Sequence, residues 1–548
     1  MPSKRELMLV GVGFSLLTLA LTYPQVRVLS THMGTHYDTF FSVWRLAWFA
    51  HQLPRDPWHL FDANIFYPEK RTLAYSDALL LPSMLGAPLI WAGVSAVLVH
   101  NLLVLFSFVA CGVAMYALVL ELTRSRPAAW VAGAIYAFQP YRFGHYAQLE
   151  LLWGWPIPLA LLAFHRLCSR QRVRDGVWLG LAIGLQVWSC LYYAVFLCTG
   201  LAVLAVVLAA ARHRSVLLSL FKPLLAAALV STAVAGAYAV AYVGSGRTVG
   251  LRNDRDVLEW SPTLVNYIAT PVTNWLYGAT TGRYGHLEGI LFPGIAALIL
   301  ALFGSFQSIQ RRRLAYLVLL LVSFDLSLGL HGFLYRGLYS LVWIYRGLRV
   351  PARMFVIVSA ALAVLAGYGV ARLLTFVPRR SGKLLATPAI FGLVVLESAS
   401  MPIDLRPAPR NVPAVYTWLR DQPPAVVMEW PLPRASGLGY TQAPLYMYYS
   451  TFHWQKLVNG YSGFYPASYI ELLETVHTLP SPTAVAFMRK RSVRYLILHG
   501  EFEPRLGALT TALAASGDFE PVASTRDGEG SIAIFRLRYP PDGAVRVR

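Results

Sequence analysis

Long apolar runs, separated by short polar or basic turns, follow one another along most of the chain. A run of about 20 apolar residues is long enough to cross a bilayer as a helix. We therefore predict a polytopic α-helical membrane protein with about eleven transmembrane helices. They lie near 7–24, 100–121, 128–141, 151–168, 176–192, 193–211, 217–243, 289–307, 314–330, 354–374 and 384–400.

One further apolar run, at 79–99, decides the orientation of all the others. Short basic clusters favour the cytoplasmic side of a membrane. If the run at 79–99 does not cross, every such cluster falls on the same side as Lys4 and Arg5. The clusters are at 124–126, 166–174, 212–222, 311–313 and 379–383. Pro82 and Pro88 also interrupt the run, so we expect it to be a re-entrant or juxtamembrane segment.

This orientation places four loops of the transmembrane domain, residues 1–400, on the outer side. They span about 25–99, 141–150, 244–288 and 331–353. Residues 401–548 follow the last span and also lie outside. Their pattern differs from that of the spans, because VVMEWPL, VRYLILHG and SIAIFRLR read as strands. PAVYTWLRD, PASYIELLETVHTL and PTAVAFMRKR read as helices. We expect a soluble, extracytoplasmic α/β domain.

The first outer loop contains an amphipathic helix, GTHYDTFFSVWRLAWFAHQL, at 34–53. Tyr37, Phe41, Trp44 and Trp48 share one face at helical spacing. Asp38, Ser42, Arg45 and Gln52 lie on another face. Aromatic side chains favour the membrane interface, so we expect this helix to lie flat on the membrane.

Composition agrees with a membrane protein. The chain has 548 residues, of which 56% are hydrophobic and 14% charged, and its mean hydropathy is +0.50. The formal net charge of +20 would suggest nucleic acid as a partner of a soluble protein. Here basic loops facing anionic lipid headgroups, with some arginines for a phosphate ligand, explain the charge, and no nucleic acid is expected.

Several classes of chemistry have no motif in this sequence. The chain has no Walker A loop, no G-x-G-x-x-G before a helix, no HExxH and no GxSxG. The four cysteines have no CxxC spacing, and His145, His286 and His331 share no ligand spacing. The remaining candidates are acids and arginines concentrated in the outer loops.

Three acids stand at the outer membrane surface, each with a structural alternative. Asp38 begins the aromatic helix, where it could cap the helix or act as a base. Glu150 begins the fourth span, where it could be an interfacial acid or could position an acceptor or a metal. Asp77 precedes the apolar run at 79–99, which it could cap, or it could contact substrate.

Arginines of the third and fourth outer loops are candidates for binding phosphate, because a guanidinium can donate two hydrogen bonds to one phosphate. Arg252 lies in GSGRTVGLRNDRDVLEW, and Arg349 and Arg353 lie in YRGLRVPARM. The alternative for each is contact with lipid headgroups. Arg353 enters an apolar helix, so we expect it to have a charged partner.

The order of these features resembles the GT-C superfamily of integral membrane glycosyltransferases. In both, a long outer loop with an early acid, here HYDTFFSVWRLAWFA, follows the first span and ends in a prolyl apolar segment. A basic inner turn, ELTRSRPAAW, and a short outer loop with an acid, YRFGHYAQLE, come next. NIFYPEKRTLAYSD, YRGLRVPARMF and HWQKLVNGYSGFYP also resemble segments of bacterial members that have an outer C-terminal domain.

The resemblance implies a fold, a reaction and a location. It implies inverting transfer of a sugar from a polyprenyl-phosphate donor to a glycan, lipid or protein acceptor. Asp38 is then the general base, Glu150 a second acid, and Asp77, Arg252, Arg349 and Arg353 contact substrate. The implied location is the bacterial inner (cell) membrane, with the site outside. Whether a divalent cation, Mg²⁺ or Mn²⁺, takes part stays open, and no metal ligand is assigned.

Two other classes of function remain open from the sequence. A transporter or flippase of lipid-linked glycans predicts ionisable residues at mid-membrane, for which Asp325 is the main candidate. A non-catalytic scaffold would bind through its C-terminal domain. In that domain HWQKLVNGYSGFYP could line a sugar site or serve only for core and turn packing.

Overall fold

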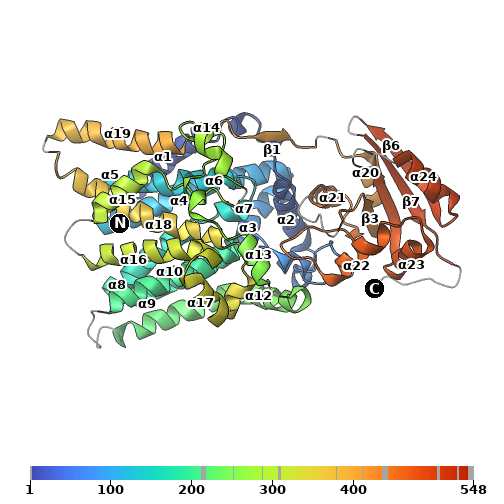
Figure 1. Ribbon diagram of the computed structural model, residues 1–548, viewed down its shortest axis with the longest axis horizontal. Helices are drawn as coiled ribbons and strands as arrows, with labels where there is room; N and C mark the ends of the chain where they lie inside the picture. The colour runs from blue at the N-terminus through green and yellow to red at the C-terminus, as the bar shows by residue number, and fades with distance from the viewer. Residues whose placement is uncertain are drawn as a thin grey trace.

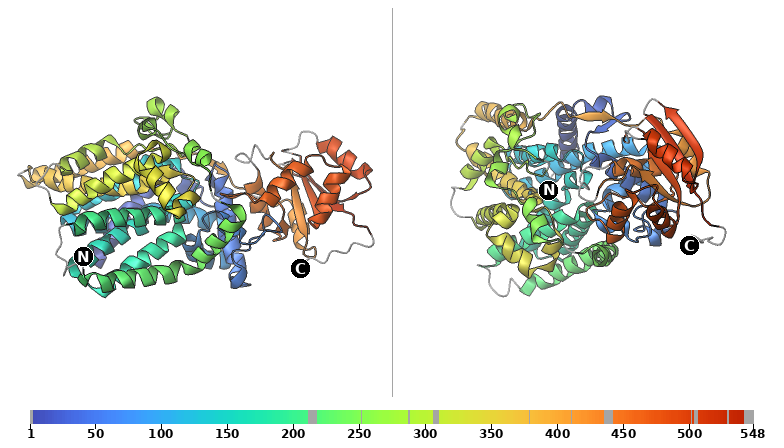
Figure 2. Two further views of the ribbon diagram at one scale, coloured as in Figure 1. Left: turned by 60° about the horizontal axis from the view of Figure 1, so that its bottom comes forward. Right: turned by 45° about the vertical axis from the view of Figure 1, so that its right-hand side comes forward.

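The computed structural model describes residues 3–210, 218–250, 252–286, 288–305, 310–377, 379–409, 411–434, 442–500, 502, 506–527 and 530–540. A helical bundle occupies one end of the molecule and a small α/β domain the other (Figure 1). The first outer loop lies between them, and two further views show the same order (Figure 2). Residues 211–217, part of one predicted inner cluster, lie outside the described residues.

Helices make up the bundle and the loops at its end. The bundle helices are α1 (Lys4–Leu21), α4 (Ala96–Thr123), α5 (Arg126–Phe138), α8 (Pro156–Arg170), α9 (Val173–Ser189), α10 (Leu191–Ala209), α12 (Phe221–Val249), α15 (Ile295–Ser305), α16 (Arg311–Ser327), α18 (Phe355–Leu373) and α19 (Arg380–Ser398). The loop helices are α2 (Asp38–Gln52), α3 (Leu80–Trp91), α6 (Pro140–Gly144), α7 (Leu149–Leu152), α13 (Asp254–Glu259), α14 (Gly278–Thr281) and α17 (Leu334–Leu341).

Each of the eleven predicted spans contains a helix. Among the described residues, six helical segments are long and apolar enough to cross a membrane: Ala96–Thr123, Leu149–Arg170, Leu191–Ala209, Phe221–Gly246, Pro351–Leu373 and Ser381–Ser398. The apolar helices Leu80–Trp91 and Ile295–Ser305 are shorter. The mainly helical membrane fold is therefore confirmed, and the count of about eleven crossings stays a prediction.

Small residues let two of the bundle helices approach closely. Gly176, Gly180 and Gly184 follow one another at i, i+4 and i+8 along α9 and face α12. A Cβ atom on Gly180 would lie 2.4 Å from the carbonyl oxygen of Ala227 on α12. Where lipid replaces water, such close backbone contact is a main source of helix association.

The C-terminal domain has a five-stranded sheet in the order β4-β3-β5-β7-β6. Its strands are β3 (Val426–Trp430), β4 (Lys456–Leu457), β5 (Val493–His499), β6 (Phe519–Asp527) and β7 (Gly530–Leu537). β4, β3 and β5 are parallel, and β7 and β6 are antiparallel to their neighbours. The helices are α20 (Ala414–Arg420), α21 (Ala443–Ser450), α22 (Ala467–Val476), α23 (Pro482–Lys490) and α24 (Leu506–Ala515). The predicted strands and helices are thus present.

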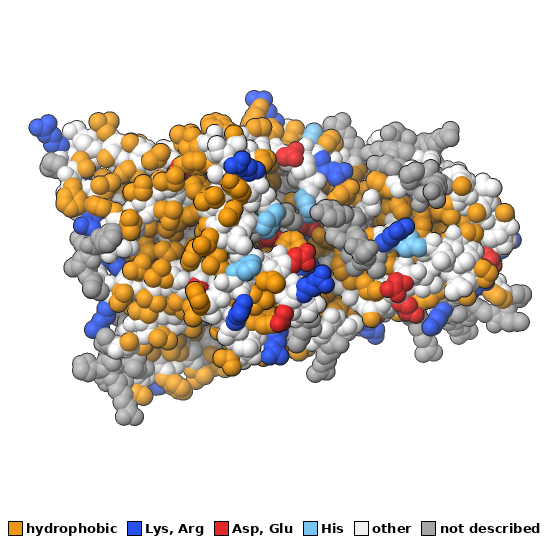
Figure 3. Space-filling view, in the orientation of Figure 1, with side chains coloured by type: hydrophobic (Ala, Val, Ile, Leu, Met, Phe, Trp, Pro, Cys, Tyr) orange, Lys and Arg blue, Asp and Glu red, His pale blue; other side chains and the backbone are white. Residues whose placement is uncertain are grey.

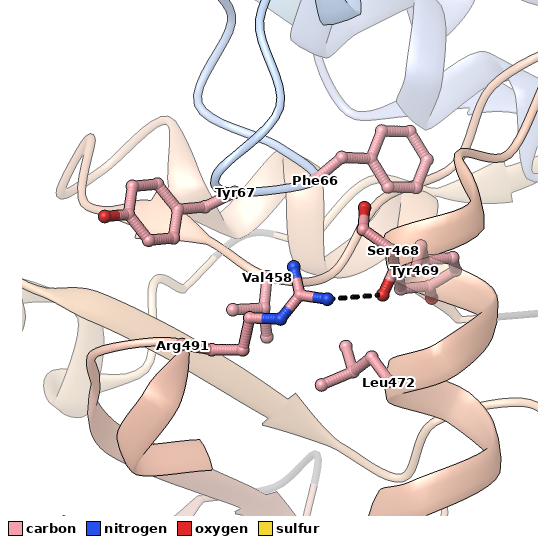
Figure 4. Close-up of a pocket in the computed structure, with 7 residues that line it drawn as sticks. All are labelled: Phe66, Tyr67, Val458, Ser468, Tyr469, Leu472 and Arg491. Carbon is pink, nitrogen blue, oxygen red and sulfur yellow. Dashed lines mark hydrogen bonds between the residues drawn. The ribbon is translucent and has the colours of Figure 1, made fainter. Parts of the chain in front are cut away.

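The first outer loop is joined to the C-terminal domain at several places. β1 (His32–Gly34) pairs with β2 (Leu405–Pro407), and most of the buried apolar side chains of α2 form one cluster with those of β3 and β5. A small crevice marks this junction, between Phe66 and Tyr67 of the loop and α22 of the domain (Figure 4). The predicted domain boundary at residue 400 stays a prediction. One hydrophobic cluster contains buried residues of both the first outer loop and the C-terminal domain, so these two parts pack together.

The setting of α2 differs from the sequence prediction. Residues 38–50 are buried, so α2 does not lie exposed on a membrane surface. Its aromatic face packs against the C-terminal domain, where the ring of Phe41 meets Tyr461 edge-on and Trp48 contacts Trp454. An aromatic stripe fits a protein core as well as a membrane interface, so the pattern alone could not separate the two.

The α9–α12 contact gives a prediction about stability. We expect Gly180→Ala to lower the thermal unfolding midpoint of the detergent-purified protein, because the new methyl group meets backbone that cannot move aside. Overpacking of this kind costs about 1–3 kcal/mol. Gly236→Ala, on α12 with no atom within 4 Å of its Cβ position, is the matched control and should not lower the midpoint. Equal effects of both substitutions would contradict this packing.

Candidate active site

Asp38 is the first helical residue of α2, and donors from other segments hold its carboxylate. The hydroxyl of Tyr461 donates to Oδ1 at 2.7 Å, and the side-chain amide of Gln148 donates to Oδ2 at 3.1 Å. Nδ1 of His36 lies 3.3 Å from Oδ2. Three parts of the chain therefore converge on one carboxylate: the start of the first outer loop, the second outer loop and the C-terminal domain.

The surroundings of Asp38 keep it ionised. Burial alone would raise its pKa, but the hydrogen bond and charge of His36, with Tyr461 and Arg45, lower the pKa below its usual value. The pKa of His36 is raised, chiefly by Asp38. Nδ1 of His36 also lies 3.2 Å from the amide nitrogen of Asp38, so the neutral ring can accept from that amide and the protonated ring donates to the carboxylate.

A buried ion pair supports α2 from the other side. The guanidinium of Arg45, 1% exposed, pairs with Oε2 of Glu150 at 2.9 Å. It also donates to the carbonyl oxygen of Asp77 and to the hydroxyl of Ser42. Its plane lies 4.1 Å from the centre of the Phe41 ring. Arg45 therefore ties α2, α7 and the segment before α3 together at the end of the bundle nearer the C-terminal domain (Figure 1).

Asp77 lies beside this pair and is itself buried. Its Oδ1 accepts from the backbone amide of Leu191 at 2.5 Å, at the N-terminus of α10. Burial and the charge of Glu150 raise its pKa to about 6, although Arg353 and Arg45 act in the opposite direction. The predicted helix-capping contact exists, but it is made to α10 and not to the apolar run at 79–99.

Arg353 has the charged partner expected for it. Both its Nε and Nη2 donate to Glu288, and Nε2 of His145 lies 3.1 Å from the same carboxylate. Burial would raise the pKa of Glu288, but Arg353 and His145 lower it. The positive charge of Arg353 is therefore already compensated within the protein.

Arg252 and Arg349 differ from Arg353, which is paired with Glu288. Among the described residues, neither forms an ion pair with a carboxylate. Arg252 lies 3.5 Å from the centre of the Phe464 ring and donates to the carbonyl oxygen of Gly463, while Arg349 lies over Trp260. Burial and the charge of Arg349 lower the pKa of Arg252 to about 10, despite neighbouring groups that raise it.

An apolar groove of about 230 Å³ is lined in part by Phe464, the residue whose ring lies against Arg252. It is bounded by the last turns of α12, by the 3₁₀ turn Trp343–Gly347 and by Phe464. Its lining residues are Ala74, Tyr242, Val243, Ser245, Gly246, Val249, Gly250, Trp343, Ile344, Gly347 and Phe464. An apolar groove with a wall residue, Phe464, that stacks on an arginine without a carboxylate partner suits a molecule with an apolar chain and an anionic head.

The hypothesis that Asp38 caps its helix is wrong. Tyr37 is the N-cap residue and its side chain makes no capping bond, while the amide of Asp38 lies 3.2 Å from Nδ1 of His36. The expectation that Glu150 is an interfacial acid is also wrong, since it is buried against Arg45. The structure brings Asp38, Glu150 and Asp77 together around Arg45. Tyr461 bonds to Asp38 and its pKa is influenced by the charge of Arg349, while Arg252 contacts Gly463 and Phe464 of the same segment.

Sequence reasoning missed several residues of this site. Arg45 had a detectable signal, because it shares the polar face of α2 with Asp38 and Ser42. Gln148 lies two positions before Glu150 in the second loop. Tyr461 belongs to the aromatic segment HWQKLVNGYSGFYP, but no spacing relates it to Asp38, 423 positions away. In the described part of the chain, no three His, Cys, Asp or Glu side chains are grouped as for a metal ion.

The fold is similar to that of solved glycosyltransferases. The arabinofuranosyltransferase AftD from Mycobacteria matches 99% of this chain and 42% of its own, at 15% identity and a TM-score of 0.64. The oligosaccharyltransferase AglB from Archaeoglobus fulgidus, in complex with an inhibitory peptide and a dolichol-phosphate, matches 98% of this chain and 75% of its own, at 16% identity and a TM-score of 0.51. This chain thus spans about two fifths of the length of AftD.

No family model and no curated protein matches the sequence. At identities of 15–16% the solved structures establish the fold alone. The fold that the resemblance in the sequence implies is thereby confirmed.

The Arg45–Glu150 pair gives a prediction about the supporting role of Glu150 in the stability of the fold. We expect Glu150→Gln to lower the unfolding midpoint strongly, because a buried guanidinium then lacks its counter-charge, at a cost of about 3–5 kcal/mol. Adding Arg45→Met should restore part of the loss. Asp421→Asn breaks the exposed pair with Arg420 and should cost less than about 1 kcal/mol. A Glu150→Gln protein as stable as the parent would contradict the account.

Proposed function

We propose that this chain is a membrane glycosyltransferase that uses a polyprenyl-phosphate sugar. The acceptor hydroxyl gives its proton to Asp38 while its oxygen forms a bond to the anomeric carbon. The bond between that carbon and the phosphate oxygen breaks, and the polyprenyl phosphate leaves. Attack opposite to the leaving group inverts the anomeric configuration.

The state of Asp38 is the observation that carries this proposal. Its carboxylate is ionised, almost buried and held in place by side chains from outside its own helix. A general base needs this combination of a fixed position and a free proton-accepting form. A carboxylate needed only for helix stability would bond to the amides of its own first turn, which Asp38 does not do.

The arginines and the groove support a lipid-phosphate donor. An isoprenoid chain fits the apolar groove beside Phe464, and Arg252 and Arg349 stabilise the charge that develops on the leaving phosphate. Arg353 is assigned a supporting role, because Glu288 already compensates its charge. Glu150 and Asp77 likewise position α2 through their contacts with Arg45. Whether Mg²⁺ or Mn²⁺ takes part in the reaction stays open.

The distribution of charge on the surface supports an extracytoplasmic site. Apolar side chains cover most of the bundle, and acids, histidines and arginines gather where the bundle meets the C-terminal domain (Figure 3). The basic turn at 311–313 lies at the opposite end of the bundle from that domain (Figure 1). By the positive-inside rule, the C-terminal domain and Asp38 then face the extracytoplasmic side. The membrane that we propose is the bacterial inner membrane, as the resemblance to GT-C enzymes implies.

The transporter alternative loses its main support. Asp325 was the candidate for an ionisable group at mid-membrane, but its two carboxylate oxygens accept from the backbone amides of Phe333 and Leu334. It therefore stabilises the start of α17 at the bundle end. A scaffold role is separated from catalysis by the experiment that follows.

Asp38→Asn should reduce transfer from a polyprenyl-phosphate sugar by about 10²–10⁴-fold, the usual contribution of a general base. The measurement is product formation by the purified protein in lipid vesicles. Asp404→Asn, an exposed acid next to Thr35, is the matched control and should leave the rate unchanged. Undiminished transfer by a folded Asp38→Asn protein would exclude this mechanism.

The pH dependence of transfer follows from His36. Because the pKa of Asp38 is below its usual value of about 4, the parent should keep its activity down to about pH 4. In His36→Ala the burial of Asp38 is offset only by Tyr461 and Arg45, so the pKa of Asp38 rises. As the pH is lowered, this variant should lose activity at a higher pH than the parent does. His59→Ala removes an exposed histidine paired with Asp56 and should not move the profile. An unmoved acid limb in His36→Ala would refute the assignment.

A further inference from the structure

The tip of one loop of the C-terminal domain spans the site. The tip comprises residues 461–465, lies between β4 and α22 and has no helix or strand of its own. Both sides of it are anchored. The amide of Phe66 donates to the carbonyl of Asn459, and the hydroxyl of Ser468 bonds to Glu69. Between these anchors the backbone of residues 461–464 belongs to no helix or strand, and the ring of Tyr465 packs against Phe66 and Tyr469.

The tip contacts the two ends of the proposed reaction centre at once. At one end the hydroxyl of Tyr461 donates to Oδ1 of Asp38. At the other end the carbonyl of Gly463 accepts from Arg252, and the ring of Phe464 lies against the same guanidinium. The proposed base and the arginine proposed for the phosphate are therefore linked by a segment of four residues, 461–464.

The contacts at Arg252 are ones that a phosphate would replace. A peptide carbonyl offers a guanidinium a neutral acceptor, whereas a phosphate offers charge and two hydrogen bonds. The lowered pKa of Arg252 agrees with a buried cation that lacks such a counter-charge. Phe464 also lines the groove, so an apolar chain entering the groove presses on the same residue. Both parts of a prenyl phosphate thus compete with the tip.

The contact at Asp38 is one that an acceptor would replace. Burial and the charge of Asp38 raise the pKa of Tyr461 well above its usual value, so its hydroxyl stays protonated and keeps donating to Oδ1. This hydrogen bond takes one of the acceptor positions of Oδ1 and makes that oxygen a weaker base toward an acceptor hydroxyl or water. Gln148 and His36 bond to Oδ2 and would keep the carboxylate in place after Tyr461 leaves.

We infer that residues 461–465 form a gate that frees the base only when a donor phosphate is bound. A phosphate at Arg252 displaces the carbonyl of Gly463, the tip loosens, and Tyr461 releases Oδ1 of Asp38 to the acceptor. The inference rests on the proposed function of Asp38 and Arg252. The gate gives the C-terminal domain a regulatory role, and Tyr461 is a positioning residue within it. While closed, the gate limits attack on the donor by water before the acceptor arrives.

The test measures the tip directly by hydrogen–deuterium exchange of the full chain in lipid nanodiscs. Farnesyl phosphate is the probe, and farnesol is the uncharged control. We expect farnesyl phosphate to speed exchange of amides in 461–465 several-fold and farnesol to leave it unchanged. Arg283→Gln, an exposed arginine over Tyr284, should respond like the parent. Unchanged or slower exchange with bound farnesyl phosphate, or no binding of it, would overturn the gate.

Tyr461→Phe supplies a second readout that a merely structural tyrosine would not give. We expect the tip to exchange faster without ligand, and donor hydrolysis by water, in the absence of acceptor, to rise relative to transfer. Hydrolysis and exchange equal to those of the parent would overturn the gate.

The gate and the proposed function fail in different ways. If farnesyl phosphate loosens the tip but no sugar is transferred from any donor, the proposed function fails. If Asp38→Asn abolishes transfer while the tip ignores farnesyl phosphate, the gate fails and the function stands.

Discussion

The need to compensate the buried charge of Arg45 sets the arrangement of the site. A guanidinium that is almost fully removed from solvent is stable only with a close counter-charge and with acceptors for its other donors. Glu150, the carbonyl of Asp77 and the hydroxyl of Ser42 provide these, and each comes with a defined stretch of backbone. Meeting that need fixes the orientation of α2 and therefore the position of Asp38 at its first turn.

The C-terminal domain completes this site from the other side. The domain covers the aromatic face of α2. β1, which precedes most of the bundle helices in the sequence, pairs with β2, which follows the last of them. The carboxylate of Asp38 thus lies at the junction of two hydrophobic cores, one in the bundle and one shared by the first loop and the domain. A junction between two separately stabilised bodies can open without unfolding either of them.

Local patterns in the sequence predicted much of the fold. Long apolar runs marked the bundle helices, and short runs rich in strand-forming residues marked β3, β5 and β7, since both signals depend only on near neighbours in the chain. The setting of α2 could not be predicted, because an aromatic stripe suits a membrane surface and a protein core equally. Asp38, Glu150 and Asp77 were found as acids in outer loops. Tyr461 could not be joined to Asp38, since only tertiary structure brings them together.

The central claim is that Asp38 faces the anomeric carbon of a lipid-linked sugar. The most direct measurement is an experimental structure of the protein with a non-transferable polyprenyl-phosphonate sugar. The account predicts the phosphonate between Arg252 and Arg349, the chain in the groove beside Phe464, and Asp38 within about 3–4 Å of the position of an attacking hydroxyl. A sugar bound beside Arg353 and Glu288, with Asp38 still bonded to Tyr461, would contradict it.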